Sequence, residues 1–307
     1  MEKEIMVTVY CLAYNHEKYI KDCLDGFVNQ KVNFRFEVIV HDDASTDNTP
    51  NIIQEYAEKY PDIIVPILQK ENQWSKGANI GREFLYPNFR GKYIAICEGD
   101  DYWCDNSKLQ KQVDFLEENE DYVACVHPTR VDNYMDGTSF ELRAFDKDCT
   151  VNVVDVLSKH TPIFHTTSIF YRRKVYEDVP EMCNNNEMWW DYSKLVMLAL
   201  YGKIFYMNEI MSVYRTLTEG SWTLRTRGKK NRSLNLDFPK AMIKALRFAD
   251  EYSANKYHSL MDKNILEFEY QVWRAEPHLR LLLNQRIYKL NAIRIIKMVF
   301  RCIFSII

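Results

Sequence analysis

The eight cysteines of this 307-residue chain form no Cys-x-x-Cys pair and show no other spacing typical of metal ligands. Neither a zinc site nor a disulfide framework is indicated, and we expect reduced, intracellular thiols. No uncharged run reaches the roughly 20 residues that a membrane-spanning helix needs. A strand-like run begins at Val7, which leaves no room for a signal peptide, so the expected location is cytoplasmic.

The chain also lacks a strong charge excess, an internal repeat and a low-complexity linker. Its formal net charge is −3, which argues against nucleic acid as a partner. With 47% hydrophobic residues, a chain of this length can form one large α/β domain plus an appendage.

The most informative segment of the sequence is an apolar run that is followed directly by acidic residues. Residues 93–97 have the pattern of a buried strand, and Glu98, Asp100 and Asp101 follow at once. Carboxylates crowded at a strand end repel one another unless a cation neutralises them. Mg²⁺ or Mn²⁺ is expected, because hard cations prefer oxygen ligands. A solvated acidic turn is the alternative, but Trp103 follows directly and favours the wall of a site.

Two earlier junctions have the same form of strand, polar loop and helix. The loops contain Ala13, Tyr14 and Asn15 after a strand at 7–12, and Asp42 and Asp43 after a strand at 36–41. Helices are predicted to follow at 17–29 and 51–60. This succession implies βαβ units and a parallel sheet. Because ligands bind at the carboxyl ends of such strands, we expect all three polar clusters on one edge of the sheet.

The order of these motifs resembles the family 2 inverting glycosyltransferases of GT-A fold. The matching motifs are residues 13–15, 40–47, Asn72 with Gly77 and Asn79, 91–94, 98–101 and 101–112. The likeness is strong over roughly the first 125 residues and continues more thinly to about Trp222. It implies an α/β fold with a GT-A type nucleotide-binding sheet, mostly parallel and Rossmann-like, and a C-terminal helical extension.

The pattern of predicted strands and helices divides the sequence into three parts. Residues 1–126 alternate strands and helices and would form the nucleotide-sugar-binding half of the GT-A domain. Residues 127–225 would form the acceptor-binding and catalytic half, with a strand at 167–171 and a helix at 191–201. Residues 226–307 would contain a basic loop and helices.

The resemblance assigns nucleotide binding to the strand-end loops. The residues are Ala13, Tyr14, Asn15, Asp42, Asp43, Asn79, Glu98 and Gly99. Asp42 or Asp43 would contact the base, and a carboxylate that accepts an imide N–H favours a UDP-sugar donor. Glu98 and Asp100 stand at the acidic positions of the family's Asp-x-Asp motif. Asp100 is the expected ligand of Mn²⁺ or Mg²⁺, with Glu98 and Asp101 as further candidates.

The catalytic base is expected from the second half of the chain. Asp191 opens an apolar-faced helix, and its segment resembles the one that presents an acid to the acceptor hydroxyl. Glu187 is the fallback. Asp191 could instead cap the helix and complement its dipole.

Four residues are expected near the diphosphate or the acceptor: Trp103, His165, Trp190 and Arg215. Arg215 matches the family's Tyr-Arg element and could hold phosphate. Many members place His two residues further on, where this chain has Leu217, and His165 could partly replace it. The basic residues at 225–230 could close over the diphosphate or form a solvated loop. Each tryptophan could equally belong to the core.

The C-terminal residues 286–307 are rich in basic and apolar residues and contain no acid. On a helix, five basic residues fall within one arc: Arg286, Lys289, Arg294, Lys297 and Arg301. This pattern predicts a helix in the membrane interface, with its basic side toward anionic headgroups at the inner face of the cell membrane. Packing against the catalytic domain or a partner subunit is the alternative.

The sequence thus predicts an inverting, divalent-metal-dependent glycosyltransferase that acts on a saccharide or lipid-linked saccharide in the synthesis of a bacterial capsule, O-antigen or exopolysaccharide. A sugar-nucleotidyltransferase would have a glycine-rich phosphate loop after its first strand, and residues 13–16 contain no glycine. A non-catalytic sugar- or nucleotide-binding module of the same fold stays open, because Glu98 and Leu217 depart from the family pattern.

Overall fold

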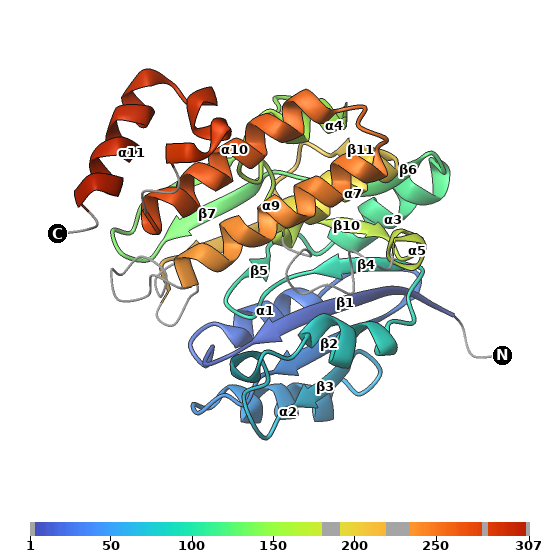
Figure 1. The fold of residues 1–307 in the computed structure, drawn as a ribbon. Helices are drawn as coiled ribbons and strands as arrows, with labels where there is room; N and C mark the ends of the chain where they lie inside the picture. The colour runs from blue at the N-terminus through green and yellow to red at the C-terminus, as the bar shows by residue number, and fades with distance from the viewer. Residues whose placement is uncertain (1–3, 180–190, 219–233, 278–281, 305–307) are drawn as a thin grey trace.

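A computed structural model describes residues 4–179, 191–218, 234–277 and 282–304. Its centre is a mixed sheet, eight-stranded in the described part of the chain (Figure 1). Its strands in spatial order are β3 (Ile64–Leu68), β2 (Arg35–Asp42), β1 (Ile5–Ala13), β4 (Tyr93–Ile96), β10 (Phe170–Arg172), β6 (Tyr122–Val126), β11 (Lys203–Tyr206) and β9 (Cys149–Val151). Strands β3, β2, β1 and β4 are mutually parallel, which confirms the predicted parallel sheet.

A smaller sheet joins segments that lie far apart in the sequence. Its described strands, in order, are β5 (Tyr102–Trp103), β12 (Ser212–Thr216), β7 (Thr129–Asn133) and β8 (Ser139–Leu142). Residues 98–101 form a loop with three acidic side chains, called the acidic loop below. Strand β5 follows this loop directly and pairs with β12. This pairing ties the acidic loop to the second half of the chain.

Helices cover both faces of the large sheet. Helices α1 (Ile20–Val28), α2 (Thr49–Lys59) and α3 (Lys108–Glu118) share one hydrophobic core with β1 and β2, whereas α7 (Asp191–Tyr201), α9 (Leu234–Tyr252) and α10 (His258–Ala275) share the other. Two short helices, α4 (Val153–Leu157) and α5 (Lys174–Asp178), complete the second layer. Along β1, Val7, Val9 and Cys11 face the first core, while Tyr10 faces the second. This alternation is the two-residue period of a strand with both faces buried.

Short 3-10 and π turns connect the longer elements. They are η1 (Trp74–Lys76), η2 (Gly81–Leu85), η3 (Tyr86–Asn88), η4 (Thr166–Ser168) and η7 (Gln285–Lys289). The strand predicted at 167–171 is therefore partly wrong, because its first residues form η4. The His165 side chain accepts from the Thr167 N–H, and Ser168 Oγ donates to the His165 carbonyl, so polar side chains stabilise a turn there.

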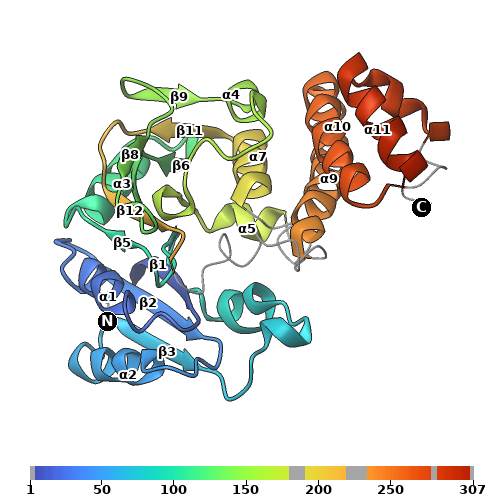
Figure 2. The same cartoon turned by 90° about the vertical axis from the view of Figure 1, so that its left-hand side faces the viewer.

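The predicted single helix at 286–307 is also wrong. It is divided into η7 and α11 (Ala292–Phe304). The division lies at Asn291, whose Oδ1 accepts from the Arg294 N–H at 3.0 Å and so begins a new helix. Figure 2 shows α9, α10 and α11 gathered on one side of the sheets, with α11 outermost. None of the described helices is both long and apolar enough to cross a membrane.

Lys108 at the start of α3 is fully buried beneath the sheet. Its Nζ donates to Gln112 Oε1 at 2.6 Å and lies 4.5 Å from the centre of the Trp103 ring. Burial lowers the pKa of Lys108 from 10.5 to about 7, because the protein interior solvates an ammonium poorly.

This depressed pKa predicts a pH-dependent cost to stability. Between pH 7 and 10.5 the unfolded chain binds a proton that the folded chain does not, so the Lys108 contribution to the free energy of unfolding rises with pH. The stability of Lys108→Met relative to wild type should therefore decrease as pH rises from 7 toward 10, measured by urea unfolding. The exposed Lys59→Met is the control and should show a constant difference. A constant difference for Lys108→Met would mean that Lys108 is charged in the folded protein.

Candidate active site

The carboxyl ends of β2, β1 and β4 meet at one edge of the large sheet. Ala13 is opposite Asp42 in the β1–β2 register, and Tyr10 is opposite Ile96 in β1–β4. The loops continue the pairing, since the Gly99 N–H donates to the Leu12 carbonyl at 2.9 Å. This geometry confirms that the three polar clusters lie on the same edge.

The loop after β1 is held to the loop after β2 by Asn15. Its backbone is left-handed, with φ = 57°, a conformation that Asn tolerates better than most residues. Its N–H donates to Ser45 Oγ and its Oδ1 accepts from the Thr46 N–H, both at 2.8 Å. Asp42 in turn accepts from the Ser45 N–H at 3.0 Å. Asn15 and Asp42 therefore shape the two loops.

Asp43 organises the segment that follows β3. Its carboxylate accepts from the backbone N–H groups of Gln73 (2.7 Å) and Trp74 (3.1 Å). A carboxylate has about four acceptor positions, so capacity for another donor is left. Asn79 lies two residues before η2, and its Oδ1 accepts from the Arg82 N–H at 2.9 Å.

The acidic loop turns in a tight space at Gly99, where a larger residue would require neighbouring side chains to move. A Cβ on Gly99 would approach His16 Nδ1 to 2.8 Å and Ile20 Cδ1 to 2.9 Å. The loop leaves Glu98 exposed but buries Asp100 and Asp101. Although solvent reaches Glu98, the protein that surrounds its carboxylate reduces its hydration; this effect, followed by repulsion from Asp100 and Asp191, raises the pKa of Glu98 to about 8.

The two buried aspartates have different surroundings. Asp100 Oδ2 accepts from Thr218 Oγ1 at 3.2 Å and lies 4.0 Å from His16 Nε2. Asp101 Oδ1 accepts from the Arg215 N–H at 2.8 Å, while its Oδ2 accepts no hydrogen bond from any residue that the structure describes. Burial and the charge of Asp100 raise the pKa of Asp101 well above its usual range.

Arg215 lies beneath the acidic loop and is held by protein groups, so its contact with phosphate stays a prediction. Its Nη1 donates to the Asp100 carbonyl at 3.1 Å, and its Nη2 forms an ion pair with Asp22. Its guanidinium lies 4.4 Å from the centre of the Tyr102 ring. The side chain is only 5% exposed, so it stabilises the loop from below.

Of the two places considered for Trp103, a site wall and the core, the structure shows the core. It is buried in the core and makes an edge-to-face contact with Phe27, with ring centres 4.9 Å apart. Its backbone lies so close to α1 that a Cβ on Gly26 would come within 2.9 Å of the Trp103 carbonyl. Trp103 therefore anchors β5 against α1.

Helix α7 brings a second group of charges to the acidic loop. Asp191 stands in its first turn, partly exposed. One turn later the buried Lys194 donates from Nζ to the Tyr10 hydroxyl at 3.1 Å. Burial opposes its charge, but Tyr10, Asp191 and Glu98 favour it, and together they raise the pKa of Lys194. The ammonium therefore counters carboxylates at this edge.

Lys194 and Tyr10 were not among the residues predicted from the sequence. A signal was present, however. Asp191 and Lys194 are the only charged residues of α7, and three residues apart they share one face of the helix. A lysine in an otherwise apolar helix is seldom fully buried unless it has a partner.

His165 lies between the acidic loop and α7. Its ring stacks on Tyr214 with centres 3.9 Å apart, and its Nδ1 is 3.9 Å from Asp101 Oδ2. Burial lowers its pKa to about 4, against the opposing effect of Asp191 and then Asp100. A neutral imidazole thus stands beside the carboxylates, as required of a metal ligand or a hydrogen-bonding group.

Several predicted residues lie outside the described residues: Glu187, Trp189, Trp190, Trp222 and the basic residues at 225–230. Tyr14 is described and lies half-buried in the loop after β1.

The chemistry of the site fits a divalent cation that shares its ligands with a substrate. In the described ranges no three His, Cys, Asp or Glu side chains form a metal cage. Reduced hydration and then the charge of Asp100 raise the pKa values of Glu98 and Asp101, and a cation would oppose both effects. Mg²⁺ and Mn²⁺ commonly use one or two carboxylates and complete their shell with phosphate oxygens.

Comparison with known proteins places the chain in a family. Residues 8–180 match the family model described as Glycosyl transferase family 2. An uncharacterized protein of Mycobacterium tuberculosis is 39% identical over 220 residues, which span 70% of this chain and 60% of that protein. The putative teichuronic acid biosynthesis glycosyltransferase TuaG of Bacillus subtilis is 34% identical over 113 residues, which span 37% of this chain and 42% of TuaG. The chain thus spans less than two thirds of these relatives.

Solved structures of low sequence identity share the fold. Staphylococcus aureus TarS 1–349 in complex with UDP-GlcNAc superposes with a TM-score of 0.63 at 18% identity, over 96% of this chain and 79% of that one. The mannosyltransferase PcManGT from Pyrobaculum calidifontis, in complex with GDP-Man and Mn²⁺, gives a TM-score of 0.53 at 18% identity, over 97% and 84%. The fold is of GT-A type, as predicted, and the chain belongs to glycosyl transferase family 2.

Proposed function

We propose that this protein transfers a sugar from a nucleoside-diphosphate donor to an acceptor hydroxyl, with inversion at the anomeric carbon. The observation that carries the proposal is the approach of Asp191, from the second half of the chain, to the acidic loop of the first. Lys194, one turn after Asp191, donates to the Tyr10 hydroxyl of β1 at 3.1 Å, and His165 Nδ1 lies 3.9 Å from Asp101 Oδ2. Beyond the effect of reduced hydration, the charges of Asp100 and Asp191 both raise the pKa of Glu98 and oppose the lowered pKa of His165. A base and a diphosphate site are thereby close enough to act on one substrate pair.

The donor would bind across the edge formed by β2, β1 and β4. Asp42 and Asp43 lie at the β2 end and would contact the base, which favours uracil. Ala13, Tyr14 and Asn15 offer the adjoining loop, with Asn79 beyond it and Glu98 and Gly99 beside the diphosphate. UDP-GlcNAc is bound by the similar TarS fold, which supports a UDP-sugar as the donor.

Asp191 would act as the general base. The acceptor oxygen attacks the anomeric carbon as its proton passes to the Asp191 carboxylate, and the bond from carbon to the phosphate oxygen breaks. A single displacement of this kind inverts the configuration. Lys194 places a positive charge among Asp191, Glu98 and the departing diphosphate, where it limits repulsion.

A divalent cation, Mn²⁺ or Mg²⁺, would be held by Asp100, with Glu98, Asp101 and His165 as further candidates. When bound, it would act as a Lewis acid that stabilises the charge of the leaving diphosphate. The similar PcManGT fold was solved with Mn²⁺, which supports this ion.

The acceptor is proposed to be a saccharide or lipid-linked saccharide of a bacterial surface polysaccharide. Relatives named for this chemistry include TuaG and the minor teichoic acid biosynthesis protein GgaA of Bacillus subtilis, 26% identical over 74% of this chain. A lipid-linked acceptor would bring the protein to the inner face of the membrane as a peripheral protein.

Replacement of Asp100 tests the metal. Asp100→Ala should abolish transfer and remove the part of the UDP-induced thermal stabilisation that requires Mn²⁺, because bound ligand stabilises by mass action. The exposed Asp114→Ala removes an equal charge and should keep both properties. If Asp100→Ala is stabilised by UDP in a Mn²⁺-dependent way, the ion is held elsewhere.

Replacement of Asp191 separates a base from a helix cap. Asp191→Asn retains an oxygen that can cap, so stability and UDP affinity should be nearly unchanged. Turnover at saturating donor should fall about 10²-fold or more, because amides cannot take the proton. The control Asp237→Asn changes an exposed acid in the first turn of α9 and should leave turnover, stability and UDP affinity unchanged. Normal turnover in Asp191→Asn, with loss in Glu187→Gln, would assign the base to Glu187.

A further inference from the structure

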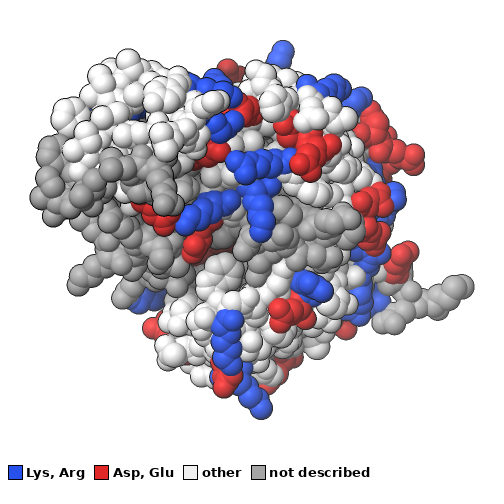
Figure 3. All heavy atoms as spheres, in the orientation of Figure 1, with Lys and Arg blue, Asp and Glu red and all other residues white. Residues whose placement is uncertain are grey.

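Helix α11 has two apolar faces, one buried against α10 and one largely exposed, with basic residues between them. Met298 and Cys302 are buried against α10 together with Tyr270, Trp273 and Ile287. A second face is apolar but lies in solvent: it consists of Ile293, Ile296, Phe300 and Ile303, which are 47–65% exposed. Lys297 and Arg301 lie between these faces. In Figure 3 the surface over α11, at the upper left, is accordingly almost free of charge.

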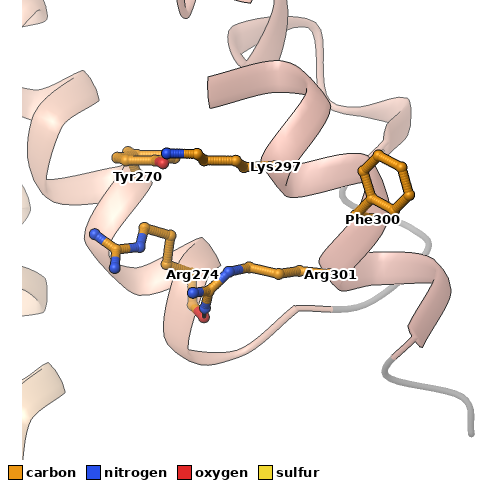
Figure 4. A pocket seen from close by; sticks show the side chains of 5 residues that line it. All are labelled: Tyr270, Arg274, Lys297, Phe300 and Arg301. Carbon is orange, nitrogen blue, oxygen red and sulfur yellow. Dashed lines mark hydrogen bonds between the residues drawn. The ribbon is translucent and has the colours of Figure 1, made fainter. Parts of the chain in front are cut away.

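A pocket of about 460 Å³ opens between α10 and α11, beside the exposed apolar face. It is lined by Tyr270, Arg274, Lys297, Phe300 and Arg301. Figure 4 shows Lys297 and Arg301 reaching from α11 toward Tyr270 and Arg274 of α10. Arg301 Nη1 donates to the Arg274 carbonyl at 2.8 Å. Three cationic side chains and two aromatic rings thus surround one space.

These three cations differ from the other basic residues at the C-terminus. Arg286 pairs with Asp262 and Glu269, Lys289 with Asp262, and Arg294 with Glu267. The arc of five basic residues predicted to face lipid is therefore largely used within the protein. Arg274, Lys297 and Arg301, by contrast, form no ion pair with a carboxylate in the described part of the chain, and no acid lines their pocket. Their charge is available to an anion.

We propose that this pocket binds the phosphate headgroup of an anionic membrane lipid while the exposed apolar face of α11 enters the interface. The site is separate from the proposed sugar transfer and does not depend on it. Lys297 and Arg301 would bind the phosphate oxygens, and Arg274 would add charge from α10.

The neighbouring apolar side chains favour a lipid over a soluble phosphate. Phe300 lines the pocket yet is 58% exposed, and Ile296 and Ile293 extend the same face away from it. A free anion would leave Ile293 and Ile296 largely exposed to water. A membrane surface offers phosphate to the cations and acyl chains to the isoleucines together.

Sedimentation of the full chain with vesicles tests the proposal. Wild type should bind equimolar phosphatidylcholine–phosphatidylglycerol vesicles and bind phosphatidylcholine alone far more weakly. Lys297→Ala/Arg301→Ala should reduce the partition coefficient about 30-fold, the loss expected for two cations at an anionic surface. The matched control Lys256→Ala/Lys263→Ala removes two exposed lysines from the same helical layer and should retain most of the binding. Lys297→Glu alone, at a side chain without an ion pair, serves if the double variant is unstable.

Three outcomes would overturn the proposal. Equal losses in the pocket and control variants would indicate diffuse charge attraction. Equal binding of neutral and anionic vesicles would remove any role for the headgroup. Thermal stabilisation by inorganic phosphate that depends on Lys297 and Arg301, without vesicle binding, would assign the pocket to a soluble anion. Stabilisation by UDP and Mn²⁺, measured in parallel, reports on the transferase site, so the two proposals can fail independently.

Discussion

The crowding of carboxylates with reduced hydration at the edge of the large sheet is the constraint on which the site depends. Glu98, Asp100, Asp101 and Asp191 are brought together there, and the protein stabilises them with its own cations. Lys194 adds charge from α7, and Arg215 holds the acidic loop through its backbone N–H and guanidinium. These contacts join residues from both halves of the chain. The fold can therefore keep the acids in place before any ligand arrives, at the cost of raised pKa values in Glu98 and Asp101.

The features that follow from local pattern were predictable from the sequence. Strands β1, β2 and β4, their polar ends and their common edge all follow from short apolar runs that end in Asp, Asn and Gly. Features that depend on which way a side chain faces were not. In β5, Trp103 faces the core, and in β12, Arg215 faces Asp22, because the two-residue period of a strand is set by its pairing partner. For Trp103, its position just after the acidic loop in the sequence did not predict which way its side chain faces.

In the C-terminal helix, too, the direction in which side chains face could not be predicted from the sequence. Its apolar residues form two faces, and the sequence does not distinguish the face that packs on α10 from the face that stays in solvent. The break at Asn291 also changes the register between Arg286 and Arg294, so basic residues assigned to one arc have separate roles. Only the packing of Met298 and Cys302 distinguishes the buried apolar face of α11 from the exposed one. Lys194 was missed for a related reason, since its partner Tyr10 lies in the first strand of the fold.

The position of β10 in the large sheet has a consequence for how the chain acquires its structure. Strand β10 (Phe170–Arg172) lies antiparallel between β4 and β6, which precede it in the sequence. During synthesis from the N-terminus, β4 and β6 emerge before the strand that separates them. Until β10 arrives, each has an unpaired edge, and β4 and β6 could pair wrongly with each other or with a neighbouring chain. The large sheet therefore cannot close between β4 and β6 until residues 170–172 have been made, and the need for a chaperone should be greatest before they emerge.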